Sequence, residues 1–129
     1  MKRTILLIED NEQNRYLTTY LLRNKGYDVV SADDGHAGIA RAEEGGVDLI
    51  LLDIQLPVMD GYAVAARLRE GPATSRIPIV AVTSYAMAGD REKALASGCN
   101  GYIEKPINPE TFVSEVERYF INSGTAERT

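Results

Sequence analysis

The sequence predicts an α/β fold in which five parallel strands form a single sheet with helices on both faces. Short, almost wholly apolar runs recur along the chain, for example Ile5–Ile8, Leu49–Leu52 and Ile79–Val82. Such runs are typical of strands that are buried on both faces. Segments with apolar residues at helical spacing alternate with them. Because strands that alternate with helices form parallel sheets with right-handed crossovers, we expect helices on both sides of the sheet.

Each expected strand is bounded by polar or turn-forming residues. In chain order the strands are Ile5–Ile8, Tyr27–Ala32, Leu49–Asp53, Ile79–Val82 and Gly101–Glu104. Reactive side chains stand at the C-terminal ends of all but the second, namely Glu9 with Asp10, Asp53, Thr83 and Lys105. The strand ends are therefore where we expect the chemistry of the protein to lie.

Helices are expected after each strand, begun or ended by capping residues, glycines or prolines. They run from about Glu12 to Lys25, from Asp34-Gly35 to near Gly45-Gly46, from Asp60-Gly61 to the loop at Gly71-Pro72, from Asp90 to Ser97, and from Pro109, capped by Asn108, toward residue 121. Apolar side chains expected to share a helix face are Leu17 and Leu21; Val64, Ala65 and Leu68; and, facing inward, Ala94 and Leu95 and then Phe112, Val113, Val116 and Phe120. These patterns predict one helix for each strand.

Length and composition indicate one small globular domain. The chain has 129 residues, and no apolar stretch approaches the roughly 20 residues of a membrane span. Its formal net charge of -5 argues against nucleic acid or an anionic membrane as the direct partner. The lone Cys99 cannot form an internal disulfide, which favours the reducing cytoplasm. We expect a monomeric, cytoplasmic domain over residues 1–121, followed by a polar tail over residues 122–129.

The strand order decides which reactive side chains meet. Five strands in this alternation resemble the flavodoxin-like order 2-1-3-4-5, in which the chain reverses direction between strands one and three. Glu9, Asp10 and Asp53 then lie beside the crevice at that switch point, where open α/β sheets bind their ligands. Thr83 comes from the adjoining strand, and the long stem of Lys105 reaches in from the edge strand.

Three carboxylates in one crevice need compensating positive charge. Two carboxylates about 4–5 Å apart repel each other by roughly 3–4 kcal/mol at an effective dielectric of about 20. A hard divalent cation relieves this repulsion, and Mg²⁺ binds through carboxylates, waters and phosphate oxygens. With Mg²⁺ and Lys105 neutralising the phosphoryl oxygens, an aspartate oxygen can attack a phosphoryl donor.

Each of these residues also has a simpler explanation when it is taken alone. Asp10 could cap the first helix, and Asp53 could be a turn residue. Thr83 could be an ordinary strand-end hydroxyl, and Lys105 a solvated loop lysine. The complete set, in this order and at these strand ends, favours a site that handles a cation and a phosphoryl group.

Four segments of the sequence carry a resemblance to a known family. Ile8–Asn11, Leu52–Gly61, Val82–Ser84 and Lys105-Pro106 are similar to the signatures of receiver domains of two-component response regulators. Together with the segments between them they span about residues 4 to 121. The resemblance implies the flavodoxin-like (βα)5 fold and a role in phosphoryl signalling.

The resemblance first implies a phosphorylation site and a metal site. Asp53 would accept a phosphoryl group from a phosphohistidine of a histidine kinase or histidine phosphotransferase. Mg²⁺ would be the cofactor, bound by Asp10, Asp53 and the backbone carbonyl of Gln55, with Glu9 acting mainly through a bound water. The first acidic position is Glu9 where aspartate is commoner in the family, which lengthens the side chain but keeps its charge.

It also implies a switch. Thr83 and Lys105 would stabilise the phosphoryl group, and Thr83 and Tyr102 would form a coupled pair that changes position on phosphorylation. The bond before Pro106 would be cis, a minority state for X-Pro bonds. Ser84 replaces the alanine often found after the switch threonine, so contacts of that loop are not implied by the resemblance.

The activity implied is that of a single-domain response regulator and not of an enzyme that turns over outside substrates. The protein would catalyse its own phosphorylation and a slow hydrolysis, with Gln55 and Tyr85 controlling the access of water. The signal would leave through the fourth helix, fifth strand and fifth helix to a downstream protein. Residues 85–92 resemble stand-alone cell-division regulators of the DivK type and receivers of hybrid kinases. The alternative is accordingly a receiver that belongs to a hybrid histidine kinase or a larger regulator.

Other functions on the same fold agree less well with the sequence. A flavin-binding carrier would need a phosphate loop rich in small residues after the first strand, where this chain has Glu9-Asp10-Asn11-Glu12. An aspartyl phosphatase would need a second carboxylate two residues after Asp53, where this chain has Gln55. A receiver that works without phosphorylation usually lacks an acidic residue or the lysine, and neither is missing here. His36 stands at a helix start, far from the strand ends, so we interpret it as a solvated side chain.

Overall fold

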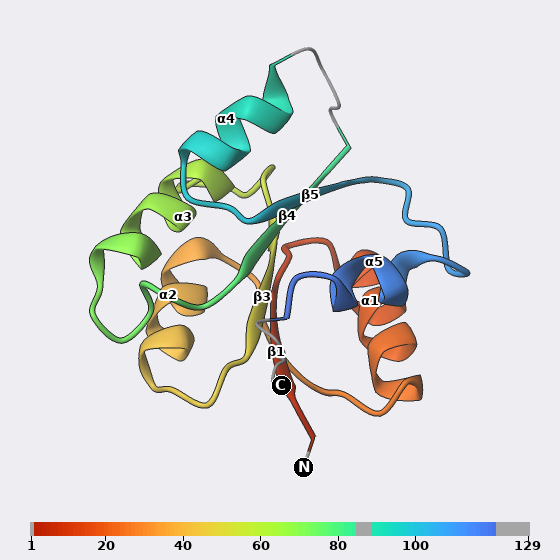
Figure 1. The fold of residues 1–129 in the computed structure, drawn as a ribbon. Coiled ribbons are helices and arrows are strands. Elements are labelled where there is room, and N and C mark those ends of the chain that lie inside the picture. The colour runs from red at the N-terminus through yellow and green to blue at the C-terminus, as the bar shows by residue number, and fades with distance from the viewer. Residues whose placement is uncertain (1, 85–88, 121–129) are drawn as a thin grey trace.

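A computed structural model describes residues 2–84 and 89–120 (Figure 1). Within these residues, five parallel strands form one sheet in the order β2-β1-β3-β4-β5. The strands are β1 (Thr4–Ile8), β2 (Asp28–Ala32), β3 (Leu49–Asp53), β4 (Ile79–Thr83) and β5 (Gly101–Glu104). The predicted class and strand order are confirmed. Tyr85 and the predicted polar tail, residues 122–129, lie outside the described residues.

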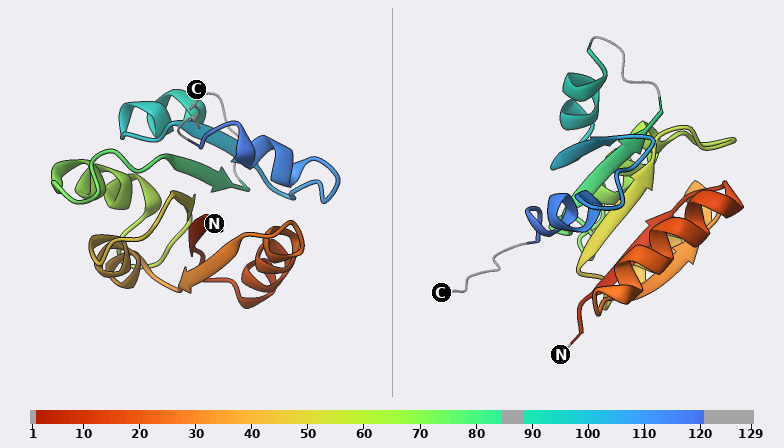
Figure 2. Two further views of the ribbon diagram at one scale, coloured as in Figure 1. Left: turned by 60° about the horizontal axis from the view of Figure 1, so that its bottom comes forward. Right: turned by 90° about the vertical axis from the view of Figure 1, so that its right-hand side faces the viewer.

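Helices of the described part of the chain cover both faces of the sheet. They are α1 (Glu12–Asn24), α2 (Gly35–Glu43), α3 (Gly61–Glu70), α4 (Asp90–Ala96) and α5 (Phe112–Glu117). Helices α1 and α5 lie on one side, and α2, α3 and α4 on the other (Figure 1 and Figure 2). Among these helices, none combines the length and apolar character that a membrane span requires.

The sheet divides the hydrophobic core in two because successive strand side chains point to opposite faces. On β1, Leu6 and Ile8 pack in the core beneath α2 and α3, whereas Ile5 and Leu7 pack in the core beneath α1 and α5. All four side chains are buried. This explains why the strands read as continuous apolar runs and not as an alternation of apolar and polar residues.

Side-chain caps fix where the first three helices begin. The Asn11 side chain accepts a hydrogen bond from the Asn14 N–H at 2.9 Å at the start of α1, and Asp34 and Asp60 cap α2 and α3 in the same way. The cap of α1 is thus Asn11, so the carboxylate of Asp10 is not used for capping. Gly26, expected to end this helix, follows it with a φ of 101°.

The predicted start of the last helix is wrong. Helix α5 begins at Phe112 and not at Pro109, and its N-cap is Thr111. The Asn108 side chain instead accepts a hydrogen bond from the Glu110 N–H at 3.0 Å. This local bond closes a turn over residues 109–111, which delays the helix.

One predicted helix face needs correction, and another is only partly buried. On α1 the buried side chains are Thr18 and Leu22, while Leu17 is 38% exposed. On α4 only Ala94 is buried among the helix residues, and Leu95 is 43% exposed instead of inward. On α1 the buried face therefore contains Leu22, with Leu21 partly buried against the same core.

The loop between β3 and α3 is tightly constrained. A Cβ at Gly61 would lie 2.6 Å from the Asp53 carbonyl oxygen, so the close approach of α3 to the end of β3 requires glycine. At the tip, the Met59 N–H donates to the Pro57 carbonyl at 2.7 Å around Val58, which has a φ of 66° and is 98% exposed. A positive φ strains a β-branched residue, and no packing of the exposed side chain offsets the strain.

We expect Val58→Gly to stabilise the protein by roughly 0.5–1 kcal/mol, because glycine relieves the backbone strain at a smaller entropic cost. Urea denaturation of the metal-free protein measures this difference. Val58→Ala is the matched control, since it keeps a Cβ and should recover little of the gain. A less stable Val58→Gly protein would contradict the strained turn.

Candidate functional site

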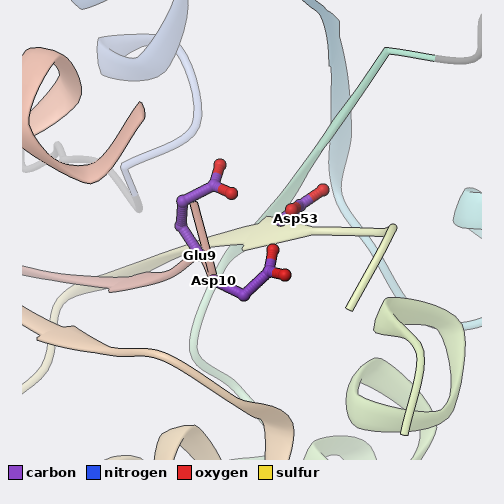
Figure 3. Close-up of side chains that lie close together, drawn as sticks. All are labelled: Glu9, Asp10 and Asp53. Atoms are coloured by element: carbon purple, nitrogen blue, oxygen red, sulfur yellow. The ribbon is translucent and has the colours of Figure 1, made fainter. Parts of the chain in front are cut away.

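The reactive strand ends meet at one edge of the sheet. In the parallel register Ile8 lies beside Leu52, Asp53 beside Val82, and Thr83 beside Glu104. Glu9, one residue past β1, is therefore level with Asp53. Figure 3 shows the side chains of Glu9, Asp10 and Asp53 gathered at the ends of β1 and β3.

Glu9 is held from several directions. The residue is 3% exposed, and its Oε1 accepts a hydrogen bond from Lys105 Nζ at 2.8 Å. Oε2 accepts one from the Asn11 N–H at 3.1 Å. The guanidinium of Arg15 donates to the Glu9 backbone carbonyl at 2.8 Å. Arg15 of α1 thus holds the Glu9 backbone, while Asn11, the N-cap of that helix, and Lys105 hold the carboxylate. Arg15 is a contributor that the sequence patterns did not indicate.

Asp53 ends β3 and is also buried, at 4% exposure. Its Oδ1 accepts a hydrogen bond from the Gln55 N–H at 3.0 Å and lies 3.6 Å from Lys105 Nζ. Burial raises the pKa of Asp53 from 3.8 to about 7, and hydrogen bonding and repulsion from Glu9 add to the rise. Lys105 and the Gln55 N–H act in the opposite direction. Without a cation, the folded protein therefore holds a proton on this carboxyl up to near-neutral pH.

The donor set fits a hard divalent cation. Glu9, Asp10 and the buried Asp53 each offer a carboxylate oxygen, and these oxygens lie within 4.8 Å of one another. Lys105 supplies one positive charge against these carboxylates, so the cluster keeps a surplus of negative charge. An all-oxygen, net-negative site of this kind suits Mg²⁺ better than the softer metals, which favour nitrogen and sulfur ligands.

Gln55 joins the site through its side chain as well as its backbone. Its Nε2 donates a hydrogen bond to Thr83 Oγ1, and its Oε1 accepts one from the Ser84 N–H at 3.2 Å. The sequence resemblance concerned the Gln55 carbonyl and the access of water. It did not indicate this bridge to the end of β4.

The predicted switch pair occupies neighbouring strands. Thr83 is buried at the end of β4, and Tyr102 lies half-buried on β5, beside Ala81. The Tyr102 hydroxyl is buried without a hydrogen-bond partner among residues 2–84 and 89–120. Burial raises its pKa, and the nearby charges of Asp90 and Glu104 raise it further.

Two further sequence expectations concern single residues. The peptide bond between Lys105 and Pro106 is cis. His36 is exposed at the start of α2, as expected of a solvated side chain. It stands apart from the contacts of Glu9, Asp53 and Lys105 described above.

Comparisons with known proteins agree with this architecture. Residues 5–117 match the response regulator receiver domain family. Over 119 residues the chain is 37% identical to the polar-differentiation response regulator DivK of Brucella anthropi, covering 92% of this chain and 97% of that protein.

One similar solved structure is the receiver domain of a sensor histidine kinase from Pseudomonas aeruginosa, which has a magnesium ion coordinated in its active site cleft. It superposes with a TM-score of 0.85 and 37% sequence identity, and the match covers 92% of this chain and 98% of that one. A second similar structure is a co-crystal of the Saccharomyces cerevisiae histidine phosphotransfer protein Ypd1 with the receiver domain of its downstream response regulator Ssk1. A chain of that structure superposes with a TM-score of 0.86. That match has 29% identity and covers 98% of this chain and 94% of that one.

The raised pKa of Asp53 predicts a pH-dependent loss of stability in metal-free buffer. Between pH 3.8 and about 7 the unfolded chain has lost a proton that folded Asp53 still binds, so stability falls as pH rises through this window. At pH 8, Asp53→Asn should therefore be the more stable protein by on the order of 2 kcal/mol, and the difference should shrink toward pH 4. Urea denaturation of both proteins in chelator-containing buffers between pH 4 and pH 8 measures this difference in stability. A difference that does not depend on pH would contradict the assignment.

Asp10→Ala should weaken Mg²⁺ binding by more than roughly tenfold, because it removes one of the clustered carboxylates. Calorimetric titration of the unphosphorylated protein with Mg²⁺ gives the affinity. Glu12→Ala is the matched control, since it removes an equal charge from an exposed residue that lines the same hollow. Equal affinities for the two variants would show that Asp10 does not bind the ion.

Proposed function

We propose that this chain, which belongs to the response regulator receiver domain family, accepts a phosphoryl group on Asp53 and transmits the event by changing a protein-docking surface. The observation that carries the proposal is the position of Asp53. It is a buried carboxylate at the end of a central strand, between an ammonium and an acidic cluster. That combination suits a nucleophile whose product carries additional negative charge.

The donor in this proposal is a phosphohistidine on a histidine kinase or a histidine phosphotransferase. The phosphorus–nitrogen bond breaks, an Asp53 oxygen bonds to phosphorus, and the histidine recovers its lone pair. The Gln55 N–H and Lys105 Nζ both approach Oδ1, which leaves Oδ2 for the attack. The structural likeness to a receiver that was crystallised with a phosphotransfer protein supports this class of partner.

Stabilisation of charge does most of the work in such a transfer. Lys105 lies close enough to Asp53 to pair with a phosphoryl oxygen on it, and the Thr83 hydroxyl can reach another after a movement of β4's end. Asp10, Asp53 and the Gln55 carbonyl would hold Mg²⁺, with Glu9 in support, and the bound ion supplies further neutralisation of the phosphoryl oxygens. The likeness to a receiver with magnesium in its cleft supports this cofactor.

The output in this proposal is a surface of α4, β5 and α5 that binds a downstream protein. When Thr83 moves toward the phosphoryl group it vacates space that the ring of Tyr102 can fill. The buried hydroxyl of Tyr102, which has no partner among the described residues, is consistent with a side chain that has a second position. Such a movement biases a balance between two states of the surface.

The remaining expectations belong to the same proposal. The receiver occupies residues 1–121, acts as a monomer in the cytoplasm, and hydrolyses its own acyl phosphate slowly without turning over other substrates. An acidic chain with no expected affinity for nucleic acid suits a protein partner. The chemistry at Asp53 is the same whether the chain acts alone or within a hybrid kinase.

Incubation with acetyl phosphate and Mg²⁺ should add one phosphoryl group, and Asp53→Asn should abolish the addition because the nucleophile is gone. Intact-mass spectrometry counts the groups. Asp48→Asn is the matched control, since Asp48 is an exposed aspartate whose hydrogen bond to the Thr4 N–H an asparagine can keep. Phosphorylation of Asp53→Asn at the normal rate would overturn the proposed site.

A further inference from the structure

The side chain of Gln55 connects two segments that must move relative to each other in the proposed switch. Its Nε2 donates to Thr83 Oγ1, and its Oε1 accepts from the Ser84 N–H at 3.2 Å and, more distantly, from Ser84 Oγ at 3.5 Å. One amide therefore contacts both residues at the end of β4. It does so with its donor and its acceptor at the same time.

The other end of Gln55 is fixed to the phosphorylation site. Its N–H donates to Asp53 Oδ1 at 3.0 Å, so the backbone position of Gln55 follows the Asp53 carboxylate. Gln55 therefore links the proposed nucleophile, through its backbone N–H, to the Thr83 hydroxyl, through its side chain. Because Thr83 is buried, its hydroxyl cannot exchange this bond for one to bulk water without a movement.

We infer that Gln55 is a positioning residue that holds Thr83 and Ser84 in their unphosphorylated place. This inference rests on the proposed function, since it concerns the approach of Thr83 to a phosphoryl group on Asp53. For the Thr83 hydroxyl to reach that group, its bond to Gln55 Nε2 must break or rearrange. The shift of Ser84 that accompanies it strains the bond to Gln55 Oε1. Gln55 thereby favours the resting state and raises the free energy that phosphorylation must supply to shift the protein out of that state.

Gln55→Met tests this role because methionine is similar in length but makes neither hydrogen bond. Its backbone N–H and carbonyl are kept, so the contact with Asp53 and the proposed metal ligand remain. Gln13→Met is the matched control, since it makes the same exchange at an exposed position on α1. Gln55→Asn is a second variant that stays polar but is too short to contact both Thr83 and Ser84.

The measurements use beryllium trifluoride with Mg²⁺ as a phosphoryl mimic. In Gln55→Met and Gln55→Asn, NMR signals of the Thr83 methyl and the Ser84 amide should move, without any ligand, toward their positions in the mimic-bound wild type. Removing bonds that favour the resting state by about the equivalent of one or two neutral hydrogen bonds should lower the half-saturating concentration of the mimic about tenfold. Gln13→Met should match the wild type in both measurements.

The outcomes separate the two proposals. If the wild type neither binds the mimic nor becomes phosphorylated, the proposed function is wrong and this inference falls with it. If the wild type binds the mimic but the Gln55 variants show unmoved signals and unchanged or weaker binding, only the positioning role of Gln55 is overturned. A shift of the signals with tighter binding supports it.

Discussion

The pairing of Lys105 with Glu9 and Asp53 is the interaction on which the functional edge of the sheet depends. Lys105 follows the edge strand β5, and its ammonium reaches carboxylates that follow β1 and β3. All three groups are largely removed from water, so each charge relies on the others for compensation. Removing the Lys105 ammonium would leave the buried Glu9 carboxylate without this ion-pair partner, a loss that typically costs about 3–5 kcal/mol in a buried pair. The pairing therefore constrains strands that are not neighbours in the sheet.

The rest of the site is arranged around this uneven balance of charge. The Asn11 side chain caps α1, which leaves the carboxylate of Asp10 available at the crevice. Arg15 donates to the Glu9 backbone carbonyl, and Gly61 allows α3 to approach the end of β3 closely. Short polar contacts thus fix the connection between β1 and α1, and a glycine allows the close packing after β3. The surplus negative charge is retained, and a cation can relieve it.

Most of the fold and much of the site could be predicted from the sequence because they depend on the spacing of apolar residues and on the order of the strands. Buried parallel strands read as apolar runs, alternation gives the strand order, and strand ends then bring Glu9, Asp53 and Lys105 together. The failures were local. The start of α5 depends on a turn closed by the Asn108 side chain, and the outward position of Leu95 depends on how α4 packs on the sheet. The Gln55 side chain contacts Thr83 and Ser84, which are distant in sequence, and no residue spacing indicates such a tertiary contact.

The sheet that carries the site also keeps the two hydrophobic cores apart. Leu6 and Ile8 belong to one core, and Ile5 and Leu7 to the other, so the helices on opposite faces share strands but not packing partners. After gene duplication, substitutions on α1 and α5 could accumulate without repacking α2, α3 and α4. Copies of such a chain can in this way diverge in the partners they recognise while the carboxylates at the strand ends stay in register.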